Sequence, residues 1–171
     1  EVLRHLPAVD AVINQAELKV DSEILSAGKK LKIVANVALG YDNLDLPLMT
    51  SCGVWAASVG DVFTEATADA TLALFLSVVR KIGEGDRYIR AGRWKGFQPG
   101  LWDGMLLSGK TFGIVGYGRI GEAVERRALA FGMKVIHTRR QPTGKPGYRD
   151  LQTLLSESDA VSLHLPLTPG T

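Results

Sequence analysis

The sequence has 171 residues, enough for one domain or two small ones, and its 46% hydrophobic and 22% charged residues are ordinary for a globular protein. A formal net charge of +2 is too small to indicate that nucleic acid or a membrane surface is the partner. The longest apolar stretch, Ala73–Val79, is well short of the ~20 residues of a membrane-spanning helix, and no secretory signal is recognisable. The single cysteine, Cys52, excludes an internal disulfide. We therefore expect a cytoplasmic protein.

Short apolar runs alternate with helical stretches in the first third of the chain. The expected elements are a strand at Val9–Ile13, a helix at Ser22–Ala27, a strand at Leu31–Val37, a helical turn at Leu46–Ser51 and a strand at Gly53–Ala57. Such alternation is typical of βα units and a parallel sheet.

A long helical region follows. The pattern predicts a helix from Thr64 to Arg80 that resumes at Glu84–Ile89. Its segment Leu72–Val79 is apolar on most faces, which predicts burial between layers or in a subunit interface. The Gly- and Trp-rich stretch AGRWKGFQPGLWDG after it is expected to be a loop at a domain boundary, with tryptophans that pack between domains rather than bind a ligand.

The remainder of the chain follows the order βαβαβ. The expected elements are a strand at Thr111–Val115, a helix at Ile120–Phe131, a strand at Lys134–His137, a helix at Leu151–Ser156 and a strand at Ala160–Leu165. This order predicts one mononucleotide-binding half of a doubly wound α/β fold.

Two phosphate-binding patterns adjoin each other in GMLLSGKTFGIVGYGRIG. Gly104–Thr111 matches the loop of ATP and GTP hydrolases, and Gly116–Gly121 matches the G-x-G-x-x-G loop that holds a dinucleotide. Each loop requires a strand before it and a helix after it. A strand follows Thr111, whereas the second pattern lies between an expected strand and an expected helix. We therefore interpret the first match as accidental and the second as a dinucleotide loop, in which Gly116, Gly118 and Gly121 have the three glycine roles.

The end of the second strand decides between the two nicotinamide cofactors. An NAD site usually places Asp or Glu there, ~20 residues after the glycines, to hold the ribose hydroxyls. Here the chain reads His137-Thr138-Arg139-Arg140-Gln141, without a carboxylate. Two guanidinium groups and a hydroxyl suit a 2′-phosphate, so NADP(H) is favoured over NAD(H).

Several stretches together resemble the D-isomer-specific 2-hydroxyacid dehydrogenases, and most closely the glyoxylate/hydroxypyruvate reductases. They are VALGYDNLDL, TEATADATLALFL, RAGRW, GKTFGIVGYGRIG and SLHLPLTPGT, in this order from Val37 to Thr171. The resemblance implies an α/β fold in which residues 1–100 are a partial flavodoxin-like substrate domain with a connecting and dimer helix at about 64–91. Residues 101–171 would be the first βαβαβ half of a Rossmann domain, and the chain would be truncated at both ends.

The resemblance also implies roles for individual residues. Leu39 and Gly40 would receive the substrate carboxylate on their backbone N–H groups. Gly118, Arg119 and Ile120 would hold the pyrophosphate, Thr138 to Gln141 the adenosine phosphate, and Pro166 would line the cofactor. The intact enzyme would act on a small 2-keto or 2-hydroxy acid as a homodimer.

The sequence departs from the family pattern in two ways. Ser58-Val59-Gly60-Asp61 replaces the usual Asn-Thr-Pro-Gly before the long helix, and Ala38 replaces a common glycine. The Arg and the Glu-tuned His that the family uses in catalysis have no counterpart. None of the three histidines, His5, His137 and His164, has a carboxylate at a spacing that suggests an acid–base pair. We therefore expect no catalytic residue in this chain.

Two functions from different classes remain open. The first is a truncated NADP(H)-dependent 2-hydroxyacid dehydrogenase that is inactive as this fragment. The second is a non-catalytic dinucleotide-binding or dimerising interaction module, which the apolar segment within Leu72–Val79 favours. No metal site is expected.

Overall fold

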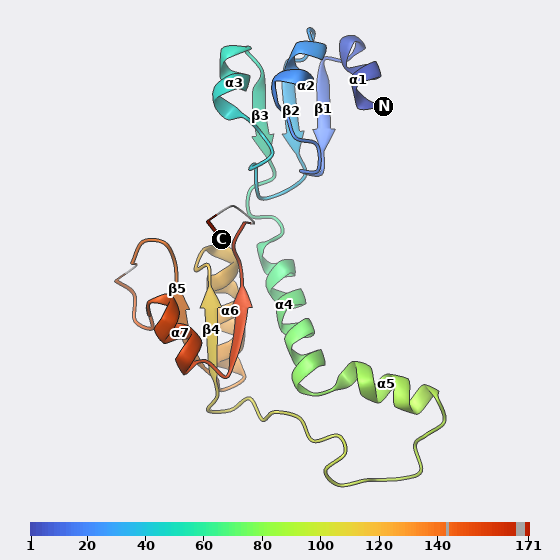
Figure 1. Ribbon diagram of the computed structural model, residues 1–171, viewed down its shortest axis with the longest axis vertical. Coiled ribbons are helices and arrows are strands. Elements are labelled where there is room, and N and C mark those ends of the chain that lie inside the picture. The colour runs from blue at the N-terminus through green and yellow to red at the C-terminus, as the bar shows by residue number, and fades with distance from the viewer. Residues whose placement is uncertain (143, 167–169) are drawn as a thin grey trace. The chain divides into compact units, whose positions relative to one another are not determined.

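The computed structural model describes residues 1–142, 144–166 and 170–171, so part of the SLHLPLTPGT motif lies outside the described residues (Figure 1). The chain forms two compact units, Glu1–Phe63 and Thr64–Thr171. Residues 64–100 belong to the second unit by their contacts. The division into domains at residue 100 stays a prediction.

The first unit contains a three-stranded parallel sheet in the order β1-β2-β3. Its elements are α1 (Val2–His5), a 3₁₀ helix (Leu6–Ala8), β1 (Ala11–Asn14), α2 (Ser22–Ala27), β2 (Ile33–Asn36), α3 (Leu46–Ser51) and β3 (Trp55–Ser58). The register aligns the last residues of the three strands, Asn14, Asn36 and Ser58, at one edge of the sheet. These carboxyl ends are where ligands bind in open α/β sheets.

Acidic side chains start two helices of this unit. Asp21 accepts hydrogen bonds from the N–H groups of Glu23 and Ile24 at the start of α2, and Asp45 accepts one from Leu48 at the start of α3. Each carboxylate satisfies donors that the helix itself leaves without a partner. The helices then cover an apolar core, which consists of Leu6, Val20, Ile24, Leu25, Leu31, Val34, Leu44, Met49 and Val54.

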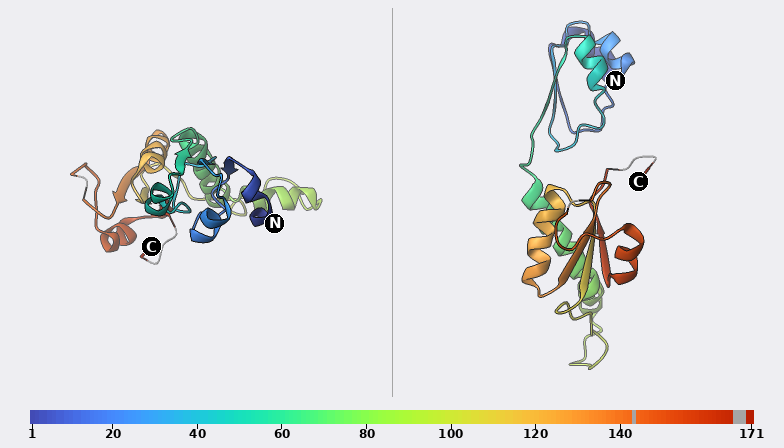
Figure 2. Two further views of the ribbon diagram at one scale, coloured as in Figure 1. Left: turned by 90° about the horizontal axis from the view of Figure 1, so that it is seen from above. Right: turned by 90° about the vertical axis from the view of Figure 1, so that its left-hand side faces the viewer.

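The second unit contains another parallel sheet, covered by helices on both faces (Figure 2). Its elements are α4 (Thr64–Val79), α5 (Ile82–Arg90), β4 (Thr111–Val115), α6 (Arg119–Ala130), β5 (Lys134–Thr138), α7 (Leu151–Glu157) and β6 (Ala160–Leu163). Successive residues of β4 face opposite sides, so Phe112 and Ile114 pack against α4 and α6, whereas Val115 packs with Leu154 of α7.

The order of the strands in this sheet is β5-β4-β6. The third expected strand, β6, therefore lies on the far side of β4 from β5. If β4 and β5 are strands 1 and 2 of the order 3-2-1-4-5-6, β6 occupies the place of strand 4. The place of strand 3, beside β5, holds a single β-bridge between His137 and Tyr148. The α/β fold class is confirmed, and the strand order adds that the reversal point between β4 and β6 is present in this chain.

The long helical region is two helices. Lys81, with a φ of 54°, separates α4 from α5. Salt bridges join α4 to α6, since Glu65 contacts Arg126 at 2.6 Å and Arg127 at 2.9 Å.

The expected burial of Leu72–Val79 holds for only one side of the helix: Leu72 is buried within the core, whereas Leu74 and Val78 are 70% and 74% exposed.

Candidate functional site

The glycine loop leads from β4 into α6 in a geometry that requires glycine at two of its positions. Gly116 has a φ of +98°, and a Cβ atom there would collide with the carbonyl group of His164, which follows β6. A Cβ atom on Gly121 would lie 2.7 Å from the carbonyl oxygen of Gly116. These contacts explain how the loop turns sharply and how α6 starts directly against β4.

The start of α6 fits an anion. Gly118 is its N-cap and provides no side-chain hydrogen bond, and a Cβ atom there would meet nothing within 4 Å. Within the described part of the chain, the N–H groups of Arg119, Ile120 and Gly121 have no acceptor, because the first helical bond is that from Glu122 to Gly118. Three adjacent donors at the positive end of a twelve-residue helix suit the pyrophosphate of a dinucleotide.

The competing pattern at Gly104–Thr111 does not form a phosphate loop. Thr111 begins β4, so a strand follows the pattern where a helix would be needed. Gly104 instead lies against the end of α4, where a Cβ atom would collide with the carbonyl group of Val79, and the next N–H group, that of Met105, donates to this carbonyl at 2.9 Å. The interpretation of this match as accidental is confirmed.

The residues expected at the adenosine phosphate lie beside the glycine loop. The N–H group of Gly116 donates to the carbonyl of Thr138 at 3.0 Å, which joins the ends of β4 and β5. Thr138 is buried, whereas the next three residues, Arg139, Arg140 and Gln141, are exposed. No carboxylate belongs to this segment, and both arginines are exposed at the edge where an adenosine ribose would bind.

An aromatic stack supports this edge from inside and was not predicted from the sequence. The Tyr117 ring, in the middle of the glycine loop, stacks on the His137 ring at 3.6 Å between centroids and 15° between planes. The hydroxyl of Tyr117 donates to Glu125 of α6. Burial, and then the bond to Glu125, raise the pKa of Tyr117, and burial lowers the pKa of His137. Both rings are therefore neutral at physiological pH. The signal in the sequence that could have indicated this stack is the aromatic residue between two glycines of the loop.

Charged groups also meet at the first turn of α6. Glu122 accepts a hydrogen bond from Lys145 at 2.6 Å, and Lys145 lies 5.3 Å from the centre of the Tyr117 ring. The bond to Lys145 is the main cause that lowers the pKa of Glu122, and Arg139 contributes electrostatically. The segment that carries the two arginines is thus attached to the helix that carries the free N–H groups.

The candidate carboxylate loop belongs to the first unit and follows β2. Leu39 is half-buried and Gly40 is exposed. Among the described residues, the N–H groups of Ala38, Leu39 and Gly40 have no acceptor, whereas the Gly40 carbonyl accepts a hydrogen bond from the Asn36 side chain at 3.2 Å. Consecutive N–H groups without partners are the donors that an anion-binding turn requires.

The histidines show structural contacts. The rings of Tyr117 and Tyr148 surround His137, and Nε2 of His164 lies 2.9 Å from the hydroxyl of Ser162. Burial lowers the pKa of His164, and His5 lies in the exposed helix α1. In the described ranges, no three His, Cys, Asp or Glu side chains are close enough together to hold a metal ion.

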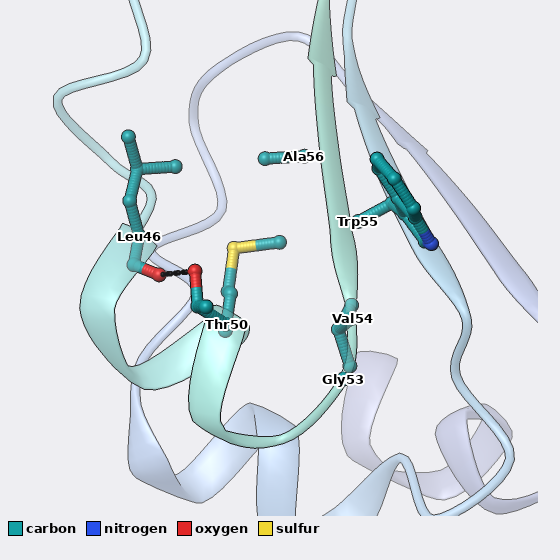
Figure 3. Close-up of a pocket in the computed structure, with 7 residues that line it drawn as sticks. Leu46, Thr50, Gly53, Val54, Trp55 and Ala56 are labelled. Carbon is teal, nitrogen blue, oxygen red and sulfur yellow. Dashed lines mark hydrogen bonds between the residues drawn. The ribbon is translucent and has the colours of Figure 1, made fainter.

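The first unit also has a cavity of about 320 Å³ between α3 and β3 (Figure 3). Its lining residues are Leu46, Met49, Thr50, Gly53, Val54, Trp55 and Ala56. The only side-chain polar groups are the Trp55 indole and the Thr50 hydroxyl, which already donates to the Leu46 carbonyl at 2.7 Å. Without a titratable group, this cavity offers no acid or base for a reaction.

Residues 72–171 match the sequence model of the D-isomer specific 2-hydroxyacid dehydrogenase NAD-binding domain. The chain belongs to this family. It is 45% identical to a glyoxylate reductase of Thermococcus litoralis, over 99% of this chain and 54% of the relative. The chain therefore spans about half the length of the curated relatives it matches.

Solved structures share the fold. The TT0316 protein from Thermus thermophilus is 44% identical, with a TM-score of 0.95 over 100% of this chain and 55% of that one. An acyclic imino acid reductase, solved in complex with NADPH and D-Arg, is 27% identical, with a TM-score of 0.85 over 99% and 55% of the two chains. The expected family and fold class are thus confirmed. Among the described helices, none has both the length and the apolar character that a membrane span demands.

Proposed function

We propose that this chain is the NADP(H)-binding part of an oxidoreductase that interconverts 2-keto and 2-hydroxy acids in the reducing cytoplasm, with glyoxylate as the first candidate substrate. The observation that carries the proposal is the start of α6, where three N–H groups without an acceptor among the described residues lie next to a strand end that is followed by Arg139 and Arg140. Family membership and the glyoxylate reductase relative support the reaction class.

Each part of the site has a role in this proposal. The N–H groups of Arg119, Ile120 and Gly121 bind the pyrophosphate, and the segment from Thr138 to Gln141 binds the adenosine ribose with its 2′-phosphate. Pro166, just after β6, lines the cofactor. When bound, the nicotinamide supplies or accepts the hydride.

The carboxylate loop has the other role. The N–H groups of Leu39 and Gly40 bind the substrate carboxylate and thereby orient the 2-keto group. We assign no catalytic acid to this chain, because the His137 ring is stacked on Tyr117, Nε2 of His164 lies against the Ser162 hydroxyl, and burial lowers the pKa of both imidazoles.

The first prediction separates cofactor binding from turnover. We expect the purified 171-residue chain to bind NADPH in the micromolar range in a calorimetric titration and to show no NADPH-dependent reduction of glyoxylate. Bound NADPH with no oxidation at 340 nm is the expected result, with a full-length family member as the positive control. Turnover by this chain would contradict the proposed absence of a catalytic acid, and the absence of binding would contradict the proposed cofactor site.

We also propose that the chain forms a homodimer through one apolar surface, the α4–α5 face. It consists of exposed side chains on both helices and the following loop: Leu74, Val78, Ile82, Ile89, Trp94 and Phe97. Each of these side chains is at least 46% exposed, with Phe97 at 84%, and large exposed apolar patches usually mark interfaces. This face is also the observation that favours the alternative function, a non-catalytic dimerising module.

The second prediction tests this face. We expect Leu74→Glu combined with Val78→Glu to convert a dimer to a monomer in light scattering at micromolar concentration, because two carboxylates cannot be buried in an apolar contact. Leu151→Glu combined with Leu155→Glu is the matched control, since both leucines are exposed on α7. A monomeric wild-type chain would refute the dimer. A stable dimer without NADPH binding would favour the alternative function.

A further inference from the structure

The chain contains three asparagines, and all three meet in one cluster at the carboxyl edge of the first sheet. Asn14 is the last residue of β1 and Asn36 the last residue of β2, and the register places them side by side. Asn43 reaches the same point from the loop after β2. Asn36 is 1% exposed and Asn14 is 7% exposed, so two amide groups are buried where the sheet meets the carboxylate loop.

The hydrogen bonds of the cluster use every N–H of its three side chains. Nδ2 of Asn14 donates to the Leu18 carbonyl at 3.1 Å and to Oδ1 of Asn36 at 3.2 Å. Nδ2 of Asn43 donates to the same two acceptors, at 2.8 Å and 3.4 Å. Nδ2 of Asn36 donates to Oδ1 of Asn43 at 2.7 Å and to the Gly40 carbonyl at 3.2 Å. A buried network without a missing partner holds its members in one arrangement.

Among the described residues, Asn36 is the member of this network whose side chain bonds to the backbone of Gly40 in the carboxylate loop. Its bond to Gly40 fixes the peptide group that follows the two N–H groups proposed to bind the substrate. Those N–H groups face no acceptor in the described part of the chain, so their direction depends on how the loop is held. Asn14, by contrast, holds Leu18 and Asn36 but makes no bond to residues 37–43 through its side chain.

We propose that Asn36 is a positioning residue for the substrate carboxylate. Through the Gly40 carbonyl it keeps the Leu39 and Gly40 N–H groups in a fixed direction before the anion arrives, and Asn43 holds Asn36 itself through bonds in both directions. Preorganised donors bind an anion more tightly than donors that must be ordered on binding. This inference rests on the proposed carboxylate role of the loop.

The experiment compares Asn36→Ala with Asn14→Ala in the whole chain, and the probe is oxamate, a stable analogue of a 2-keto acid. In ¹H–¹⁵N spectra of the wild type, oxamate is expected to shift the Leu39 and Gly40 signals saturably. We expect Asn36→Ala to weaken the oxamate affinity about fivefold or more, which is the effect of about one lost hydrogen bond. Asn14→Ala removes the two hydrogen bonds that its Nδ2 donates in the same cluster. It leaves the bond from Asn36 to Gly40, and Asn43 still donates to Oδ1 of Asn36, so the affinity should change less than twofold.

The outcomes separate the inference from the proposed function. Equal oxamate affinities of Asn36→Ala and the wild type would overturn the inference. If oxamate shifts neither signal in the wild type, the carboxylate role fails, and the inference is then judged by the ¹⁵N relaxation of Leu39 and Gly40. Faster loop motion in Asn36→Ala than in Asn14→Ala supports positioning, and equal motion refutes it. If Asn36→Ala unfolds the first unit, Asn43→Ala, which removes an acceptor of Asn36, takes its place under the same criteria.

Discussion

Arg139→Ala combined with Arg140→Ala is expected to weaken NADPH binding about 100-fold and to change NADH binding less than twofold. Each guanidinium can form charge-assisted hydrogen bonds to the 2′-phosphate, and two such contacts correspond to about two orders of magnitude in affinity. NADH lacks that phosphate, so its affinity depends on the start of α6, which the two substitutions do not touch. Calorimetric titration with both cofactors measures the ratio.

The control variant for this prediction has the same change in net charge. Lys29→Ala combined with Lys30→Ala also removes two exposed cations, but from the first unit. It should leave both affinities unchanged in moderate salt, because exposed charges that do not contact the cofactor are screened. If the arginine variant weakened NADPH and NADH binding equally, the two residues would contribute general positive potential, and the proposed preference for NADP(H) would be wrong.

Gly116→Ala is expected to lower the free energy of unfolding of the second unit by about 2–4 kcal/mol. About 1 kcal/mol comes from the positive φ, and the rest from the collision of a Cβ atom with the backbone at His164 and with Cδ2 of Leu165, at 2.8 Å. Urea unfolding followed by the amide signals of β4 reports this unit separately from the other.

Gly109→Ala is the matched variant for this comparison. Gly109 also has a positive φ, +79°, but a Cβ atom there would meet nothing within 4 Å. Its expected loss is therefore only about 1 kcal/mol, the conformational part. Equal losses for the two variants would show that the close approach of the glycine loop to His164 does not contribute, and that Gly116 is needed for its backbone angle alone.

Local patterns in the sequence predict most helices and strands of this protein. The bounds of α2, α3 and β4 match the expectation at both ends, those of α6 differ by one residue at each end, and those of α7 differ by one residue at its end. Asp21 and Asp45 show why this is possible for α2 and α3: a capping carboxylate marks where a helix starts. The short helix α1 and the 3₁₀ helix after it were missed, because a stretch this short around a proline shows no periodicity.

The position of each strand in its sheet was less predictable, because it depends on contacts between distant residues. The alternating pattern that predicts β6 is the same on either side of β4, so the sequence left its place open. Likewise, Asn14 and Asn36 read as ordinary strand ends, and only the register shows that they meet. The glycine loop and the residues after β5 were placed correctly in the chain, since their signals are local, but their roles in binding remain predictions.

The strand order has a consequence for how the protein folds. The central strand β4 pairs with β6, whose residues come about fifty positions later, and the glycine loop is shaped by the backbone at His164. Contacts between such distant residues form late, since a long loop must first close. During synthesis the glycine loop therefore leaves the ribosome well before β6, and the proposed cofactor site is completed only when β6 joins the sheet.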